Sequence, residues 1–210
     1  YGSSSAMVES GQNLTKEQMV ELADDIKEDA QWLIGMVENL LSVTKIDSGD
    51  VKLIKTPVVL EELIDSVVVR FKKRYPNQEV QIEFPDEFIS IPMDAVLMTQ
   101  VLVNMLENAV QHAKGMKTLI LRVTTIEKQA VFEIIDDGCG IPKERMNRIF
   151  NGYFETGDLP ADNQKRNMGI GLSVCASVIK AHDGEITVEN LKEGGCCFRF
   201  VLEMEEEENE

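Results

Sequence analysis

The sequence of 210 residues contains only four cysteines and two histidines, and it has no long apolar run. The cysteines form no C-x-x-C pair and have no metal-ligand spacing, which favours free thiols over a disulfide framework or a zinc site. No apolar run reaches the roughly 18 residues that a membrane-spanning helix needs, and the start is not a secretory signal. We therefore expect a globular chain with no membrane segment of its own.

Basic residues are also scarce relative to acidic ones. Lys and Arg total 21 and Asp and Glu total 37, so the formal net charge is −16. Because a nucleic-acid surface needs a basic stripe along the phosphate backbone, this balance argues against nucleic acid as a partner. A nucleotide is not excluded, since it needs only a local cluster of donors and a metal. Residues 205–210 contribute to the acidic excess, and we interpret them as a solvated tail.

The N-terminal part has the pattern of one long helix. Apolar residues from Thr15 to about Asp47 recur at alternating three- and four-residue spacing, and neighbouring apolar residues widen the stripe. Such a helix must pack against other helices, either in a four-helix bundle shared between two chains or on its own domain. The sequence D-S-G-D at 47–50 predicts a helix stop, because Gly49 can adopt the left-handed cap conformation. A domain boundary is therefore expected near residue 50.

Short strands and helices are predicted beyond this boundary. The predicted strands are 51–55, 79–84, 88–91, 118–125, 130–136, 185–190 and 196–203, and the predicted helices are 60–75, 94–114 and 171–181. Helices and strands are segregated rather than strictly alternating, which favours an α+β fold with the sheet on one side and helices on the other.

The helix predicted at 94–114 carries a line of polar side chains. Asn104 and Asn108 are four residues apart, and so are Asn108 and His112, so the three stack along one line outside the middle of the apolar stripe. Side-chain amides offer oxygens to a hard cation and N–H groups to phosphate. The alternative is a pair of solvated amides on a surface helix.

A first glycine-rich stretch follows the strand predicted at 130–136. Gly138 and Gly140 allow a tight turn and let a ligand lie against bare backbone. Asp136 stands where a buried strand ends, and a carboxylate there is costly unless it has a partner, which an adenine amino group would supply. Taken alone, D-x-G-x-G also fits an ordinary loop.

A second glycine-rich stretch opens the last helix. Gly169 and Gly171 precede that helix, so free backbone N–H groups and the positive end of its dipole favour a phosphate. The polar segment before it, residues 151–167, predicts either a lid or disorder. Lys165 and Arg166 are the basic pair nearest to the helix start, and a solvated surface pair is the alternative. A third stretch, Gly194–Gly195, predicts a hairpin turn.

In this order, the motifs resemble those of a known family. From about residue 53 to 202 the chain resembles the ATP-binding catalytic domain of sensor histidine kinases, within the GHKL group that includes the gyrase, Hsp90 and MutL ATPases. N-M-L-E-N-A-V-Q-H resembles the N box, D-D-G-C-G-I-P the first glycine box and R-I-F-N-G-Y-F the F box. G-I-G-L-S-V resembles the second glycine box and E-G-G-C-C-F-R-F the last. The N box and the last box are most similar to those of Kdp-type potassium-responsive kinases. The resemblance implies a two-layer α/β sandwich, the Bergerat fold, with a mixed sheet backed by helices.

The resemblance also implies roles for the matching residues. Asn108 would hold Mg²⁺ bridging the phosphates of ATP, with Asn104 beside it. Asp136 would take the adenine amino group, with Ile141 packed on the ring and His112 near the ribose or phosphates. The candidate catalytic residues are Asn104, Glu107 and Asn108. The remaining candidates for nucleotide binding are Gln111, Gly138, Gly140, Tyr153, Lys165, Arg166, Gly169, Ile170, Gly171 and Leu172.

For the domain organisation, the resemblance implies a partial helical hairpin followed by the ATP-binding domain. Residues 1–50 would be the C-terminal part of a dimerisation and phosphotransfer hairpin, its first helix truncated, and residues 51–204 the catalytic domain. The phosphoacceptor motif H-E/D-x-R-x-P is missing, so the chain as given would not phosphorylate itself. The implied partners are a response regulator receiver domain and a second copy of the full-length protein. The implied location is the cytoplasmic part of a membrane-anchored bacterial sensor.

Three departures from the family pattern keep alternatives open. Gln111 stands where Lys or Arg is usual, Asn167 replaces a glycine, and Gly152 replaces a bulky residue. These put the rate of phosphoryl transfer in doubt more than the binding of ATP. An ATPase of the gyrase kind would carry a glutamate where this chain has Asn104, to activate water. A non-enzymatic module that relays conformation is the third reading. The second histidine, His182, is interpreted as structural.

Overall fold

The computed structural model describes residues 15–20, 22–23, 26–27, 30, 53–146, 148–150 and 170–204. The chain divides into two compact units, 1–41 and 42–210. Residues 42–52 lie outside the described part, so the domain boundary near residue 50 stays a prediction. Among the described helices, none is both long enough and apolar enough to cross a membrane.

In the first unit, a helix begins at the predicted place. The N–H of Gln18 donates to Thr15 Oγ1 at 3.2 Å, and the N–H of Thr15 donates to Gln18 Oε1 at 3.0 Å. This reciprocal pair is a capping box, which satisfies two backbone donors at the start of a helix. Residues 16–20, 22–23, 26–27 and 30 are helical. The predicted course of this helix to Asp47 otherwise lies outside the described residues.

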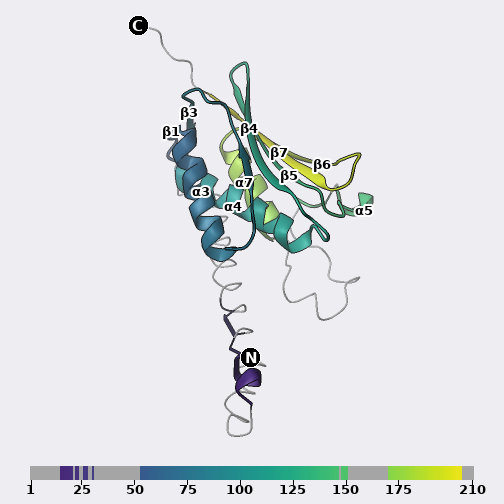
Figure 1. Cartoon of the computed structure of the whole chain (residues 1–210). Coiled ribbons are helices and arrows are strands. Elements are labelled where there is room, and N and C mark those ends of the chain that lie inside the picture. Colours follow the sequence, from purple (N-terminus) through teal and green to yellow (C-terminus); the bar gives the residue numbers. More distant parts are fainter. Residues whose placement is uncertain are drawn as a thin grey trace. The chain divides into compact units, whose positions relative to one another are not determined.

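In the second unit, helices cover one face of a five-stranded sheet (Figure 1). The sheet order is β2-β4-β5-β7-β6, with β2 parallel to β4 and the other pairs antiparallel. The strands are β2 (Gln81–Glu83), β4 (Leu119–Ile126), β5 (Gln129–Asp136), β6 (Glu185–Asn190) and β7 (Cys196–Glu203). The helices are α3 (Leu60–Arg74), α4 (Ala95–His112), the short α5 (Lys143–Met146) and α7 (Ile170–Ala181). The predicted α+β fold with a mixed sheet backed by helices is confirmed.

A separate two-stranded sheet corrects the prediction for the first strands. Residues 53–55 are not in a strand, whereas β1 (Thr56–Val59) pairs antiparallel with β3 (Ser90–Met93). Pro57 lies opposite Pro92 in this pair. Proline has no N–H to donate, and it is tolerated here because each strand has only one partner. Both strands therefore lie two or more residues further along than the predicted 51–55 and 88–91. The helix α5 was not predicted.

The core lies between the helices and the inner face of the sheet. Alternate residues of β4, such as Leu119 and Leu121, are buried, while Ile120 and Arg122 lie on the opposite face and are partly exposed. On β5 and β7, Phe132 stacks on Phe200 with ring centroids 4.6 Å apart. The alternation therefore assigns every strand residue to the helix side or to the outer side.

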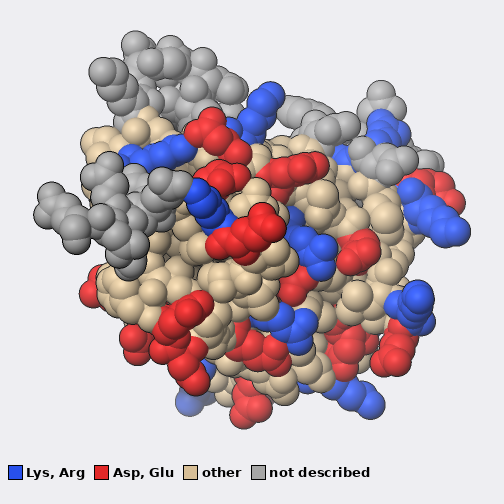
Figure 2. All heavy atoms as spheres, turned by 90° about the horizontal axis from the view of Figure 1, so that it is seen from above, with Lys and Arg blue, Asp and Glu red and all other residues tan. Residues whose placement is uncertain are grey.

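Charged residues line the outer face of the sheet. Arg122 lies 2.6 Å from Glu83 and 3.8 Å from Glu133, and Arg199 lies 2.6 Å from Glu133. These residues are directly opposite one another on neighbouring strands, so they form one row of alternating charge. Figure 2 shows acidic and basic side chains interspersed over the visible face rather than one basic patch.

His182 connects the end of α7 with the start of α4. Its side chain is buried; Nε2 accepts the N–H of Asp94 at 3.0 Å, and Nδ1 lies 2.8 Å from the Val178 carbonyl oxygen. Since Nε2 accepts, Nδ1 carries the proton. The side chain of Lys55 adds contacts to the His182 carbonyl at 3.3 Å and to Asp183 at 2.6 Å. These contacts support the interpretation of His182 as a structural residue.

Acidification is expected to destabilise the chain through His182. Burial lowers the pKa of His182 below its ordinary value near 6.5, and Lys55 lowers it further. The unfolded chain therefore binds the proton more readily, so the stabilising contribution is complete above pH ~6.5 and is lost as the pH falls through the lower folded pKa, at up to about 1.4 kcal/mol per pH unit. Urea unfolding of wild type and His182→Asn between pH 5 and 7.5 tests this. The same slope in both proteins would contradict it.

Candidate functional site

Helix α4 presents the predicted polar line beside its buried face. Asp94 caps the helix, because its Oδ1 accepts the N–H groups of Val96 and Leu97 at 3.1 Å each. Asn104 and Asn108 are both half-buried, in contrast to the buried residues that face the core. The two amides therefore lie at the edge of the helix–sheet interface.

Helix α7 packs beside the same part of α4. The side chain of Asn104 hydrogen-bonds the thiol of Cys175 on α7, and burial raises the pKa of this thiol to about 12. The Cys175 thiol also donates to the Val101 carbonyl oxygen at 3.7 Å. The middle of α7 thus lies next to the helix that carries the asparagines.

Asp136 lies at the end of β5 on the helix side of the sheet. Its cross-strand partners Leu119 and Cys196 are both buried, and Asp136 itself is 2% exposed. Its Oδ1 accepts the N–H of Gly138 at 2.9 Å, and its Oδ2 accepts from the thiol of Cys196 at 3.0 Å. Burial raises the pKa of Cys196, and its hydrogen bond to Asp136 raises it further, so the thiol stays a donor. A carboxylate has about four lone-pair sites, so Asp136 keeps the capacity to accept a further donor.

The loop after Asp136 lies against the C-terminal end of α4. A Cβ on Gly138 would stand 2.6 Å from the Cβ of Ala113, so only glycine permits this approach. The thiol of Cys139 donates to the His112 carbonyl oxygen at 3.7 Å. The structure therefore brings the D-x-G-x-G loop and the polar end of α4 together.

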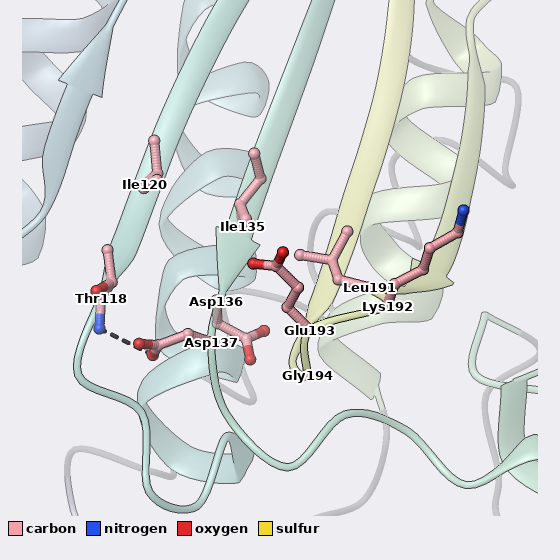
Figure 3. Close-up of a pocket in the computed structure, with 9 residues that line it drawn as sticks. All are labelled: Thr118, Ile120, Ile135, Asp136, Asp137, Leu191, Lys192, Glu193 and Gly194. Carbon is pink, nitrogen blue, oxygen red and sulfur yellow. Dashed lines mark hydrogen bonds between the residues drawn. The ribbon is translucent and has the colours of Figure 1, made fainter.

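Two side chains hold this loop at its ends. Asp137 Oδ1 accepts the N–H groups of Lys117 and Thr118 at 2.7 and 2.9 Å, which lowers the pKa of Asp137 (Figure 3). Asn190 accepts the N–H of Ile141 at 2.8 Å and donates to the Ile141 carbonyl at 2.7 Å. Ile141 is partly buried against the core. The loop is thus fixed between β4 and β6.

The hairpin turn predicted at Gly194–Gly195 is confirmed, and it also supports Asp136. Gly195 has φ +82°, and a Cβ on it would overlap the Asp136 carbonyl oxygen. The turn therefore lies directly on the backbone that ends β5.

Gly195→Ala is expected to destabilise the chain by about 1–3 kcal/mol more than Gly194→Ala. Both glycines have positive φ, but a Cβ on Gly194 would find nothing nearer than the Gly138 carbonyl oxygen at 3.7 Å. The difference in stability between the two variants therefore reports the overlap of the added Cβ with the Asp136 carbonyl oxygen. Urea unfolding of the two variants measures it, and equal losses of stability would contradict the assignment.

Two predicted site residues are engaged with α3. Arg74 donates to both carboxylate oxygens of Glu107 at 2.9 and 3.0 Å, and Gln111 Nε2 donates to the Tyr75 hydroxyl at 3.2 Å. His112 is exposed at the end of α4. Surrounding protein atoms lower the pKa of His112 by partial desolvation, and the positive charge of Arg145 on α5 lowers it further.

The remaining candidates belong to the second glycine stretch and the segment before it. Gly171 is partly buried and Leu172 is 8% exposed, both in the first turn of α7. Ile170 begins that helix. The other four candidates lie outside the described residues: Tyr153, Lys165, Arg166 and Gly169.

A hollow of about 550 Å³ lies at the same end of the sheet but on its outer face (Figure 3). Ile120 and Ile135 are paired across β4 and β5, and each alternates with residues that face the helices. The lining residues are Thr118, Ile120, Ile135, Asp136, Asp137, Leu191, Lys192, Glu193 and Gly194. Asp136 also lines this hollow, but Ile120 and Ile135 place it on the face of the sheet opposite α4.

Sequence reasoning missed the supports of Asp136. Cys196 was assigned only to a strand and Asn190 only to the end of another, while Asp137 was read as part of the loop. Their contacts depend on the strand register, which places Cys196 opposite both Asp136 and Asn190. The alternation of each strand was visible in the sequence, but its pairing register was not.

The comparisons with known proteins agree with this geometry. Residues 93–206 match the family described as histidine kinase-, DNA gyrase B- and HSP90-like ATPases. The chain is 36% identical to sensor protein KdpD of Clostridium acetobutylicum over 204 residues, which is 97% of this chain and 23% of KdpD. It thus spans about a quarter of the length of that relative.

Solved structures of histidine kinases share the fold. The nucleotide-free catalytic domain of ThkA has a TM-score of 0.60 and 25% identity, covering 71% of this chain and 95% of that one. ThkA in complex with the response regulator TrrA has a TM-score of 0.66 and 21% identity, covering 99% of this chain and 58% of that one. Together with the matched residues, these findings establish that the chain belongs to the family of histidine kinase-, DNA gyrase B- and HSP90-like ATPases.

Proposed function

We propose that this chain is the ATP-binding catalytic part of a sensor histidine kinase. It binds Mg·ATP and directs the γ-phosphoryl group to a histidine of the full-length protein. The observation that carries the proposal is Asp136, a carboxylate that is 2% exposed and keeps acceptor capacity. Its loop lies against the end of α4, the helix that bears Asn104 and Asn108.

The chemistry of the donor set fits this nucleotide. Asp136 accepts the adenine amino group, and the partly buried Ile141 packs against the ring. The amide oxygen of Asn108 is a hard ligand suited to Mg²⁺, with Asn104 beside it. Magnesium, when bound, neutralises charge on the phosphates. The first turn of α7, with Gly171, offers backbone N–H groups to the phosphates. Phosphoryl transfer of this kind depends on positioning and charge neutralisation.

The contacts of Glu107, which precedes Asn108 in the sequence, favour phosphoryl transfer to a protein over hydrolysis of ATP. Asn104 cannot act as a base toward water, because an amide is not basic. Glu107 is bound through both carboxylate oxygens by Arg74, which directs it toward α3. Neither Asn104 nor Glu107 is therefore placed to activate water as a general base.

The proposal extends to the rest of the protein and its partners. Residues 1–50 form the C-terminal part of a dimerisation and phosphotransfer hairpin, and 51–204 the catalytic domain. The full-length protein is a homodimer that is anchored to a membrane and holds this part in the cytoplasm. It passes phosphate to a response regulator receiver domain, as supported by the response regulator bound to ThkA. The similarity to KdpD supports a Kdp-type sensor.

Phosphoryl transfer in trans tests this function. The chain is mixed with full-length protein whose own Asn108 is replaced by Ala, together with γ-³²P-labelled ATP and Mg²⁺. We expect acid-labile, alkali-stable phosphate on the full-length protein, as for phosphohistidine. Release of labelled inorganic phosphate without protein labelling would indicate an ATPase. No ATP binding at millimolar concentration would indicate a module without enzymatic activity.

A further inference from the structure

The C-terminal end of α3 holds α4 beside the asparagines. Arg74 Nη1 donates to Glu107 Oε1 at 2.9 Å and to Oε2 at 3.0 Å. The Glu107 side chain is 12% exposed and that of Arg74 is 32% exposed, so the carboxylate is largely removed from water while the guanidinium keeps part of its hydration. An ion pair in this setting is screened less by solvent than an exposed one, and it constrains both side chains.

One helical turn further along α4, a second contact reaches the same end of α3. Gln111 Nε2 donates to the Tyr75 hydroxyl at 3.2 Å. Tyr75 is itself fixed, because its ring stacks on Phe71 with centroids 5.2 Å apart and its N–H donates to the Phe71 carbonyl at 2.9 Å. Phe71 is fully buried. The hydroxyl of Tyr75 is therefore a fixed point for α4.

The two contacts flank Asn108 along the helix. Glu107 immediately precedes Asn108, and Gln111 follows it by three residues. A rotation of α4 that moves the Asn108 amide must therefore disturb both contacts. With side chains extending about 5–6 Å from the helix axis, a rotation of about 10° displaces that amide by about 1 Å. A displacement of this size is enough to impair a catalytic geometry.

We propose that Arg74 and Tyr75 are positioning residues for the metal and phosphate end of the nucleotide, acting through Glu107 and Gln111. This inference rests on the proposed function. It assigns Glu107 to positioning rather than to proton transfer. It also gives Gln111 a role that needs no phosphate contact of the kind a basic residue would make. The amide of Gln111 holds α4 by donating to the Tyr75 hydroxyl.

Affinity for ATP with and without Mg²⁺ tests the proposal. Calorimetric titration gives the gain in affinity that Mg²⁺ provides, as a ratio of two dissociation constants. In Arg74→Met this gain is expected to fall about tenfold, since the Asn108 amide is no longer held in place. The affinity measured in EDTA should change by less than about twofold, because adenine binding at Asp136 does not use this contact. Arg74→Lys should restore part of the gain.

The matched control is Arg122→Met, which removes the 2.6 Å ion pair with Glu83 on the outer face of the sheet. This variant should keep the wild-type gain. If Arg74→Met does not fold, as judged from its melting temperature, the double variant Arg74→Met/Glu107→Met removes the uncompensated carboxylate and should show the same reduced gain. Tyr75→Phe keeps the stacked ring, and it should reduce the gain in the same direction.

The proposal is overturned if a folded Arg74→Met protein, or the folded double variant, keeps the wild-type gain. It is equally overturned if both affinities fall by the same factor, since that is the result of a general structural role. If Mg²⁺ raises the affinity of wild type for ATP and Arg74→Met shows the same gain, the positioning role of Arg74 is wrong but the proposed function stands. A wild-type chain that binds no ATP contradicts both.

Discussion

Replacing Asp136 with Asn is expected to weaken ATP binding by roughly 1–3 kcal/mol, or about 5- to 150-fold. The carboxylate already accepts from the Gly138 N–H and the Cys196 thiol, and adenine adds a third donor. An asparagine offers one acceptor oxygen and an NH₂ group, so one of the three donors faces another donor. The side chain keeps its size, so the effect reports hydrogen bonding rather than packing.

Inosine triphosphate provides the control for this prediction, because its ring carries a carbonyl oxygen where adenine has the amino group. Wild type should prefer ATP strongly, since Asp136 would repel that oxygen. Asp136→Asn should bind ATP less tightly and discriminate less between the two nucleotides. Competition with a fluorescent nucleotide analogue gives both constants. An unchanged preference for ATP would remove Asp136 from adenine recognition.

Replacing Asn108 with Ala is expected to abolish most of the affinity that Mg²⁺ adds to ATP binding. The rate of phosphoryl transfer in trans should fall by about 10²–10³-fold, because one preorganised ligand of the metal and phosphates is lost. ATP binding in EDTA should persist, since it depends on Asp136. Asn108→Asp should retain part of the rate, because a carboxylate oxygen also suits magnesium.

The control for Asn108→Ala is Thr99→Ala on the same helix. Thr99 Oγ1 donates only to the Ala95 carbonyl, at 2.7 Å, two turns nearer the start of α4. This variant should match wild type in magnesium gain and in transfer rate. Equal losses in both variants would mean that damage to the helix, not loss of a ligand, reduces binding.

The order of motifs allowed the fold to be predicted, and it named candidate residues on α4 and in the D-x-G-x-G loop, two segments that the structure brings together. The apolar stripe and Asp94 determine α4, which the structure describes as Ala95–His112. Strand alternation correctly indicated β4, β5, β6 and β7. Residues 53–55 were predicted wrongly as part of a strand from their β-propensity. The strand that forms is Thr56–Val59, and its pairing with β3 depends on long-range contacts. The short α5 has too few residues for a periodic pattern.

Tertiary contacts of the site were beyond sequence reasoning. Glu107 was named as a candidate catalytic residue, and its partner Arg74 is 33 residues away in the chain. The need for Gly138 was foreseen as freedom for a turn and a ligand. The structure adds a further reason, the close approach of Ala113. Such contacts follow from how α3, α4 and the loop are packed, and no local pattern encodes that packing.

A crystal structure of the chain with a non-hydrolysable ATP analogue and Mg²⁺ tests the central claim most directly. We predict the adenine amino group within hydrogen-bond distance of Asp136 and Mg²⁺ bound to the Asn108 side-chain oxygen. Both contacts should lie on the helix side of the sheet. A nucleotide bound elsewhere, such as in the outer hollow beside Ile120 and Ile135, or one that touches neither Asp136 nor Asn108, would contradict the account.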